Sequence, residues 1–105
     1  MILERLYLGN MDNAKNERML RRNKITHVLS ICPAQPFSFP GISYMHVPIK
    51  DTPEQDIYSW FDRCHRFIRT AVERNGAVLV HCQAGVSRSA TVIIAYLMKL
   101  SLIHI

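Results

Sequence analysis

The sequence predicts an α/β protein with a single mixed sheet flanked by helices. Three observations lead to this fold class. Short apolar and β-branched runs alternate along the chain with longer stretches of helical periodicity. A hydrophobic content of 49% with 20% charged residues is typical of a globular chain. The length of 105 residues suits one domain, which we place at residues 1–105.

The first elements are a short strand and a helix. Residues 6–8 form an apolar run that predicts a strand. Asp12 or Asn13 can cap a helix that continues to about Arg22, because both side chains accept hydrogen bonds from backbone N–H groups. Asn23 is then expected as the left-handed residue that ends this helix.

Two further strands follow. Residues 25–32 are apolar and β-branched and predict a buried strand, with Cys32 at its end as a core thiol. Residues 33–43 hold three prolines and a glycine, which predicts an irregular surface loop. Residues 43–49 alternate as a strand does. Pro48 cannot donate to a ladder, so we expect this strand at an edge of the sheet.

The clearest helical pattern lies in the second half of the chain. Apolar residues recur at i, i+3, i+4 and i+7, with arginines on the opposite face. Asn75 and Gly76 end this helix, and a strand that starts at Ala77 leads to Cys82. The apolar stripe consists of Ile57, Trp60, Phe61, Cys64, Phe67, Ile68, Ala71 and Val72.

The loop after the last strand carries the chemistry. Five residues separate Cys82 from Arg88, and a helix-like segment follows. A loop between a strand and a helix N-terminus presents backbone N–H groups to an anion. A cysteine in such a loop has its thiolate stabilised and its pKa lowered. We therefore interpret the segment as a phosphate-binding loop that contains a nucleophile. Its interior residues are Gln83, Ala84, Gly85, Val86 and Ser87.

Three residues around the cysteine have predicted roles. The planar guanidinium of Arg88 matches two oxygens of a phosphoryl group. Ser89 can donate a hydrogen bond to the cysteine sulfur, cap the following helix, or do both. We expect His81 to be a structural hydrogen-bonding residue behind the loop, because a thiolate that is already formed needs no general base.

A leaving alkoxide or phenolate also needs a proton donor. Asp51 lies in a loop after a predicted strand, which is where α/β sheets place functional groups. The residues alone leave Asp51 as either an acid or a turn residue. Asp56 most simply caps the following helix, and Glu54 is expected to be exposed.

The composition of the chain limits the classes of function that it can have. Cysteines at positions 32, 64 and 82 are an odd number without C-x-x-C spacing, which argues against a disulfide framework and a structural zinc site. We find no signal peptide, no myristoylation signal and no apolar run long enough to span a bilayer. The net charge of +5 suits an anionic substrate or a solvated basic surface, and does not indicate nucleic acid. We expect a protein of the cytoplasm, or of the cytoplasm and nucleus.

Residues 81–90, His-Cys-Gln-Ala-Gly-Val-Ser-Arg-Ser-Ala, closely resemble the signature loop of the dual-specificity protein phosphatases. This family belongs to the cysteine-dependent protein tyrosine phosphatase superfamily. The resemblance covers most of the chain. Residues 6–10 resemble the family's opening strand, 25–30 its second strand, and 47–51 the segment that carries its general acid.

The resemblance implies a role for each matching residue. Cys82 is the nucleophile and Arg88 binds the phosphate. Asp51 acts first as the acid and then as the base, and Ser89 assists breakdown of a cysteinyl-phosphate intermediate. The implied activity is hydrolysis of phosphotyrosine and of phosphoserine or phosphothreonine in phosphorylated proteins, without a metal or other cofactor. Nucleic acid and membrane are not expected partners.

The loop interior and the chain length bear on the substrate. Residues 83–87 are uncharged, whereas related phosphoinositide phosphatases usually carry lysines there, so a lipid substrate is disfavoured. The chain has no evident insertion that would build the deep pocket of the larger tyrosine-specific enzymes. The resemblance therefore implies a shallow site that admits all three phosphorylated side chains.

The sequence departs from the family at its C-terminus. Family catalytic domains continue with further helices after the one that follows the signature loop, whereas this sequence stops at Ile105. We therefore expect a truncated domain that lacks those helices and leaves an apolar helix partly uncovered. Three hypotheses follow: an active phosphatase, a catalytically weak or inactive isoform that binds phosphorylated partners, or an unstable splice product.

Overall fold

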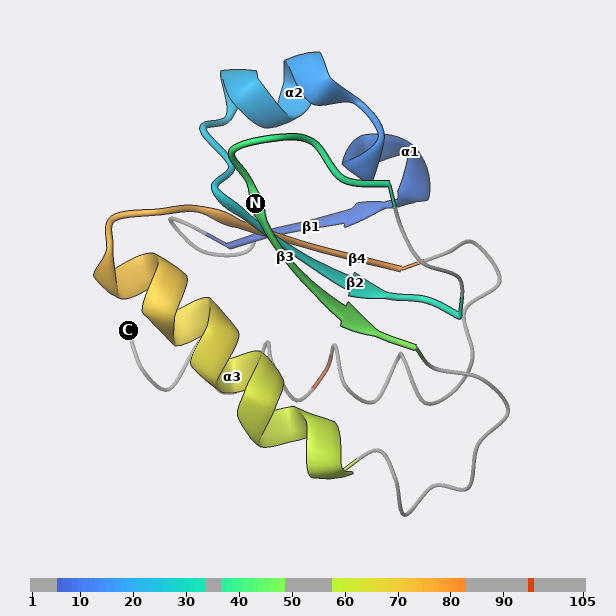
Figure 1. The fold of residues 1–105 in the computed structure, drawn as a ribbon, viewed down its shortest axis with the longest axis vertical. Coiled ribbons are helices and arrows are strands. Elements are labelled where there is room, and N and C mark those ends of the chain that lie inside the picture. The colour runs from blue at the N-terminus through green and yellow to red at the C-terminus, as the bar shows by residue number, and fades with distance from the viewer. Residues whose placement is uncertain (1–5, 34–36, 49–57, 83–94, 96–105) are drawn as a thin grey trace.

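A computed structural model describes residues 6–33, 37–48, 58–82 and 95 of the chain. Four strands and three helices lie in these ranges (Figure 1). Their bounds are β1 Leu6–Asn10, α1 Met11–Ala14, α2 Glu17–Arg22, β2 His27–Ile31, β3 Ser43–Val47, α3 Tyr58–Glu73 and β4 Val78–Cys82.

The strands form one sheet in the order β1-β4-β2-β3. All three strand pairs run parallel, so the carboxyl ends of the strands meet at one edge of the sheet. The predicted single sheet in an α/β fold is confirmed. An antiparallel pair, which a mixed sheet also contains, does not occur among the described strands. The predicted edge position of the strand before Pro48 is confirmed as well, because β3 pairs with β2 alone in this order.

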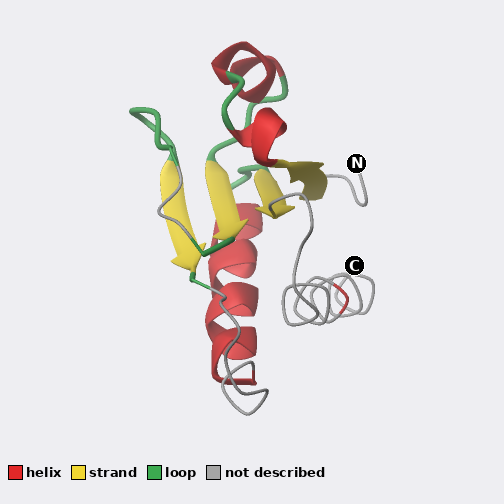
Figure 2. Ribbon diagram, turned by 90° about the vertical axis from the view of Figure 1, so that its right-hand side faces the viewer, coloured by secondary structure: helices red, strands yellow, loops and turns green. Residues whose placement is uncertain are grey.

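Helices cover both faces of the sheet, as predicted. Leu29 of β2 packs in one buried cluster with Cys64 and Ile68 of α3. Its neighbour Val28 points to the other face and packs in a second cluster with Leu20 of α2. Figure 1 shows the sheet between α3 and the two short helices, and Figure 2 shows α3 running roughly along the strand direction. These two clusters hold the strands in place, and with them the edge where the strands end.

The predicted helix over residues 12–22 is wrong in two respects. The structure divides it into α1 and α2, and the first N-cap is Asn10 instead of Asp12 or Asn13, both of which lie inside α1. The Asn16 side chain causes the division, and the Asn10 side chain sets the start of α1. Asn10 accepts a hydrogen bond from the backbone N–H of Asn13 at 3.0 Å and begins α1. Asn16 accepts one from the backbone N–H of Met19 at 3.1 Å and begins α2. Each side chain thus replaces the carbonyl partner that a continuous helix would supply.

The end of α2 also differs from the prediction. Lys24, with φ at 57°, adopts the left-handed conformation, whereas Asn23 has φ at −89°. The Asn23 amide instead donates to the Met19 carbonyl at 2.9 Å and closes the last turn of the helix. The left-handed residue is therefore displaced by one position along the chain.

Helix α3 follows the predicted apolar stripe with one exception. Phe61, Cys64, Ile68 and Ala71 are buried, and Trp60 and Phe67 pack against the same cluster. Val72 is 42% exposed, because it lies at the margin of the stripe in the last turn of the helix. Ile57 lies outside the described residues. The predicted end of the helix is confirmed: Asn75 has φ at 60°, and Gly76 N–H donates to the Ala71 carbonyl at 2.8 Å.

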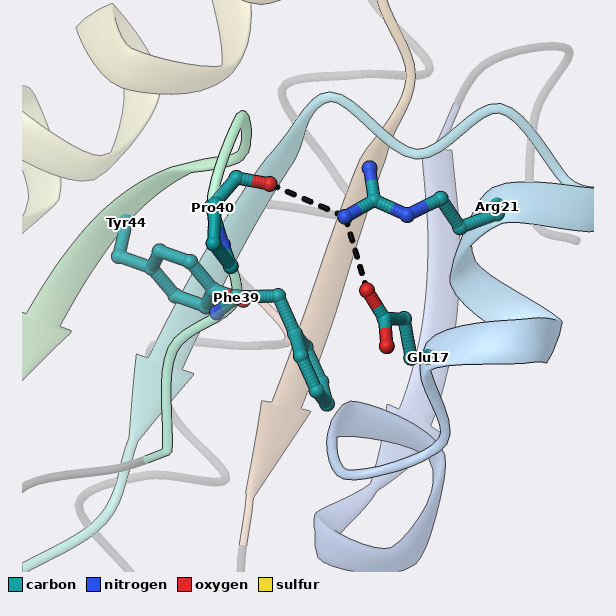
Figure 3. A network of polar contacts seen from close by, with 5 residues as sticks. All are labelled: Glu17, Arg21, Phe39, Pro40 and Tyr44. Carbon is teal, nitrogen blue, oxygen red and sulfur yellow. Dashed lines mark hydrogen bonds and ion pairs between the residues drawn. The ribbon is translucent and has the colours of Figure 1, made fainter.

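The segment before β3 is hydrogen-bonded to α2 (Figure 3). The Arg21 guanidinium donates to the Pro40 carbonyl at 3.1 Å and forms an ion pair with Glu17 at 2.9 Å. The Phe39 backbone N–H donates to the Tyr44 hydroxyl at 2.8 Å. Phe39 packs against the cluster on the α2 face of the sheet. These contacts give the approach to β3 a fixed path although it contains no regular element.

Candidate active site

Cys82 is the last residue of β4, one of the two central strands. It is in register with Asn10 of β1 on one side and with Ile31 of β2 on the other. Its side chain is half-buried. Ligands of open α/β sheets bind outside the carboxyl ends of the strands. The sheet therefore carries the predicted nucleophile to the edge where such a site is expected.

The other predicted site residues lie outside the described residues. These are Asp51, the loop interior 83–87, Arg88 and Ser89. Their roles, and the path of the predicted phosphate-binding loop between the strand and the following helix, stay predictions. The site can be built from the strand side, where Cys82 and its supporting residues are described.

His81 lies directly behind Cys82 and makes a buried hydrogen bond across the sheet. It is in register with Ser30 of β2, and both residues are 0% exposed. The Ser30 Oγ and His81 Nε2 atoms are 2.6 Å apart. Among the described residues, no group meets hydrogen-bond geometry with His81 Nδ1. This environment supports the prediction that His81 is a structural hydrogen-bonding residue.

The surroundings of His81 favour its neutral form. Burial lowers the pKa of His81, and the nearby His46 lowers it further, whereas the Cys82 backbone opposes this shift. A neutral imidazole supplies no positive charge to a neighbouring thiolate. Burial therefore disfavours His81 as a counter-ion of Cys82.

The described surroundings of Cys82 oppose the predicted lowering of its thiol pKa. Burial raises the pKa of Cys82, whereas the sequence led us to expect a lowered value. The physical reason is that strand neighbours exclude water from the sulfur without offering a positive charge. The groups predicted to lower the pKa, Arg88 and the loop amides, lie outside the described residues.

The other two cysteines are buried thiols, as expected for core residues. Burial raises the pKa of Cys64 to about 12. Burial also raises the pKa of Cys32, and the charge of a Cys82 thiolate raises it further. Cys32 follows Ile31, the register partner of Cys82, so these two thiols lie near the same edge of the sheet.

Two supporting residues escaped the sequence prediction. Ser30 is the one hydroxyl residue of β2, and a polar side chain in a buried strand needs a partner. That signal could have identified it. His46 Nε2–H donates to the Cys32 carbonyl at 2.8 Å, which fixes its tautomer because a carbonyl only accepts. No feature of the sequence pointed to His46.

The described part of the chain contains no group of three or more potential metal ligands. None of its helices is long and apolar enough to cross a bilayer.

Residues 6–104 match the family model of the dual specificity phosphatase catalytic domain, and the chain belongs to that family. It is 43% identical over 100 residues to dual specificity protein phosphatase 15 of Mus musculus, covering 95% of this chain and 43% of that protein. It is 39% identical over 100 residues to dual specificity protein phosphatase 22 of Homo sapiens, with 95% and 54% coverage. The chain thus spans about half the length of these curated relatives.

Solved structures share the fold. The crystal structure of DUSP15 superposes with a TM-score of 0.80 at 42% identity, covering 95% of this chain and 64% of that one. The crystal structure of human DUSP28 superposes with a TM-score of 0.78 at 33% identity, covering 94% of this chain and 68% of that one. A third structure is that of the human tyrosine phosphatase-like serine/threonine/tyrosine-interacting protein. It superposes with a TM-score of 0.77 at 33% identity, covering 94% of this chain and 71% of that one. The family resemblance identified from the sequence and the predicted fold class are confirmed.

Proposed function

We propose that this protein hydrolyses phosphotyrosine and phosphoserine or phosphothreonine in proteins through a cysteinyl-phosphate intermediate. One observation carries the proposal. Cys82, the cysteine of the predicted signature loop, ends the inner strand β4 at the carboxyl edge of the sheet, in a chain of the dual specificity phosphatase family. A nucleophile at this position can reach a phosphoryl group held by a loop that follows the strand.

The first chemical step transfers the phosphoryl group to sulfur. The Cys82 thiolate attacks phosphorus, the S–P bond forms, and the bond from phosphorus to the substrate oxygen breaks. Arg88 and the loop amides bind the phosphoryl oxygens and stabilise the charge that develops on them. Asp51 donates its proton to the leaving alkoxide or phenolate.

The second step returns the enzyme to its starting state. Asp51, now a carboxylate, takes a proton from water as the water oxygen attacks phosphorus. The S–P bond breaks, inorganic phosphate leaves, and the electron pair returns to sulfur. Ser89 donates a hydrogen bond to the leaving thiolate and so assists this step.

In the proposed mechanism, stabilisation of the Cys82 thiolate comes from the loop. The described neighbours raise the pKa of Cys82, and His81 offers no charge to oppose this. The proposed mechanism therefore requires Arg88 and the loop amides to overcome the burial effect.

The test is hydrolysis of a small aryl phosphate and of phosphopeptides in a buffer that contains a metal chelator. We expect turnover by the purified chain, no turnover by Cys82→Ser, and a sharply reduced kcat for Asp51→Ala. Cys64→Ala is the matched control, because it removes a thiol that lies in the core on α3. Activity that survives Cys82→Ser would overturn the proposal.

A second candidate function is phosphate-dependent binding without turnover, in a catalytically weak or inactive form. One observation favours it: a structural relative at 33% identity is named a phosphatase-like interacting protein. This candidate predicts that phosphopeptides bind to the chain and that dephosphorylation frees them, while no phosphate is released over hours. Measurable turnover in the first test excludes it.

We also propose a reducing compartment, the cytoplasm with or without the nucleus. Its support is that Cys32, Cys64 and Cys82 are all thiols, two of them buried in the folded chain. Localisation of a fluorescent fusion of the chain in cells tests it, and retention in the secretory pathway would contradict it.

A further inference from the structure

Helix α2 and the loop before β3 carry very different side chains on one face of the sheet. Residues 11–24 contain five basic and two acidic residues, a net charge of +3 within a total of +5. Residues 37–42 of the loop carry no charge and include two phenylalanines. Figure 1 shows this loop passing beside α2. A basic segment and an aromatic segment therefore lie side by side.

Most of the positive charge on α2 is not neutralised within the described ranges. Glu17 forms an ion pair with Arg21 alone, at 2.9 Å. Compensation of the helix dipole accounts for cations in the last turn of α2, but it disfavours Arg18, which lies in the first turn. Exposed cations of this kind attract anionic partners. The exposed basic residues without an ion pair to any described residue are Lys15, Arg18, Arg22 and Lys24.

The two phenylalanines of the loop have different surroundings. Phe39 packs against the buried cluster on the α2 face, whereas Phe37 is 58% exposed. Their ring centroids are 4.8 Å apart, so Phe37 rests on a ring that is itself anchored. Isolated exposed rings are common on protein surfaces. What distinguishes Phe37 is that it lies in a loop bound to a helix with unpaired cations.

The loop and the helix are held in a fixed relation. The Arg21 guanidinium donates to the Pro40 carbonyl at 3.1 Å (Figure 3). The Phe39 backbone N–H donates to the Tyr44 hydroxyl at 2.8 Å. A surface that is already ordered loses less conformational entropy when a partner binds. The cations of α2 and the ring of Phe37 can therefore contact one partner together.

From this arrangement we propose that α2 and residues 37–42, the α2 surface, dock an acidic segment of a substrate protein. Carboxylates of that segment pair with Arg18 and Arg22, and one of its apolar side chains packs on Phe37. Insertion into a bilayer uses several projecting apolar side chains, and a single-stranded nucleic acid uses several stacking rings. Phe37 is the one exposed large apolar side chain among the described residues of this surface, which favours a peptide.

The α2 surface is separate from the place where Cys82 lies. Helix α2 leads into the amino end of β2, whereas Cys82 is at the carboxyl end of β4. Parallel strands of five residues separate these two edges by about 16 Å. Val80, two residues before Cys82, packs on the opposite face, against α3. The docked segment is therefore distinct from the phosphorylated residue. The inference rests on the proposed function only in taking the partner as a substrate.

The first experiment measures binding and needs no turnover. The probe is a fluorescein-labelled peptide of about twelve residues, rich in Asp and Glu and with two leucines, followed by fluorescence anisotropy. We expect saturable binding that weakens between 50 and 300 mM NaCl, because salt screens exposed charges. The double variant Arg18→Gln with Arg22→Gln, the α2 variant, should raise Kd about two- to tenfold, a range typical of two exposed ion pairs.

A matched variant separates the α2 surface from net charge. Arg63→Gln with Arg66→Gln makes the same change of charge at two exposed arginines of α3, on the other face of the sheet. It should leave the Kd of the acidic peptide unchanged. Equal Kd values for the natural chain, the α2 variant and the α3 variant would overturn the inference, as would no binding of the peptide at 50 mM NaCl.

A second variant tests the apolar contact. Phe37→Ala removes an exposed side chain, so the fold does not depend on it. It should raise the Kd of the leucine peptide about two- to fivefold, the loss expected for one partly buried apolar contact. A peptide with serines in place of the leucines should bind the natural chain more weakly and be insensitive to Phe37→Ala. Equal effects of Phe37→Ala on the two peptides would contradict the assigned contact.

Two other anionic partners are tested with the same variants. Vesicles of phosphatidylserine and phosphatidylcholine represent a membrane surface, and a single-stranded RNA of about twelve nucleotides represents nucleic acid. Either one binding more tightly than the acidic peptide, with the binding lost in the α2 variant, would overturn the inference in favour of that partner.

The last experiment connects docking to turnover. A phosphotyrosine peptide is joined to the acidic segment by a Gly/Ser linker of about fifteen residues, which spans about 20 Å on average. The α2 variant should raise KM for this substrate and leave kcat and the hydrolysis of a small aryl phosphate unchanged. Peptide binding without any turnover would contradict the proposed function alone. Turnover with the same KM in the natural chain and the α2 variant would contradict the docking inference alone.

Discussion

Thr26 and Gly76 approach so closely that Thr26 leaves no room for a side chain at position 76. A Cβ built on Gly76 would overlap the Thr26 Oγ1 atom and would lie 3.0 Å from the Ala71 carbonyl oxygen. Thr26 is held there by two hydrogen bonds to the residue after Gly76. Its Oγ1 accepts from Ala77 N–H at 3.1 Å and donates to the Ala77 carbonyl at 3.2 Å. The contact joins the start of β2 to the turn that leads from α3 to β4.

We expect Gly76→Ala to lower the free energy of unfolding by about 1–3 kcal/mol, the usual cost of forcing extra volume into a packed site. Urea denaturation measures this change. In a Thr26→Ala background the overlap with Oγ1 is absent, so the double variant should lose less than the sum of the single losses. Strictly additive losses would show that this overlap is not the cause.

The Tyr44 hydroxyl provides a second test, because it accepts from the Phe39 backbone N–H at 2.8 Å in a partly buried position. Tyr44→Phe removes only the acceptor. We expect a loss of about 1 kcal/mol of stability and faster hydrogen exchange at the Phe39 amide. Tyr7→Phe is the matched control, since Tyr7 packs against the same cluster. No hydrogen bond of its hydroxyl is found in the described ranges. Equal losses for the two variants would contradict the assigned bond.

Burial of histidines should make stability depend on pH. Burial lowers the pKa of His81 and of His27, and Arg74 lowers that of His27 further. The unfolded chain therefore binds more protons than the folded chain once the pH falls below the unfolded histidine value of about 6.5. This contribution to stability is fully present above that pH and is lost as the pH falls toward the folded values.

Denaturation midpoints at pH 8, 6.5 and 5.5 measure this dependence. We expect the midpoint to fall between pH 6.5 and 5.5, with little change from pH 8 to 6.5. His27→Gln removes one of the two histidines with a lowered pKa and leaves the Ser30–His81 pair in place. It should reduce the slope of the denaturation midpoint against pH. A midpoint that rises as the pH falls through this range would contradict the assigned directions.

Local signals and long-range pairing explain how far the sequence could predict this fold. The apolar stripe of α3 and the Asn75–Gly76 end were predictable because both depend on residues within a few positions of one another. The break between α1 and α2 was missed although it is local. It depends on the Asn16 side chain competing with the helix for a backbone N–H, and periodicity does not report that competition.

In the candidate site, too, local features could be predicted and long-range pairing could not. Cys82 could be placed at a strand end because an apolar run leads directly to it. The Ser30–His81 bond could not be predicted, because it joins residues 51 positions apart and depends on the register between β2 and β4. Register in a sheet buried on both faces comes from packing against α3 and α2, not from a pattern within either strand.

The three cysteines should differ in reactivity because the fold places them differently. Cys64 is 0% exposed, and burial raises its pKa to about 12, so at pH 8 roughly one molecule in ten thousand carries its thiolate. Cys32 is also buried, whereas Cys82 is half-buried at the end of β4. Iodoacetamide at pH 8 should therefore modify Cys82 first, and Cys64 only through opening of the structure.

Mass spectrometry of peptides over a time course gives the three rates in one experiment. Urea below the unfolding midpoint should accelerate modification of Cys64 far more than that of Cys82, because only the Cys64 reaction requires α3 to separate from the sheet. Phe61→Ala, which removes a neighbour of Cys64 from the same cluster, should have the same selective effect without denaturant. Equal alkylation rates for Cys64 and Cys82 in native buffer would contradict the burial of Cys64 on α3.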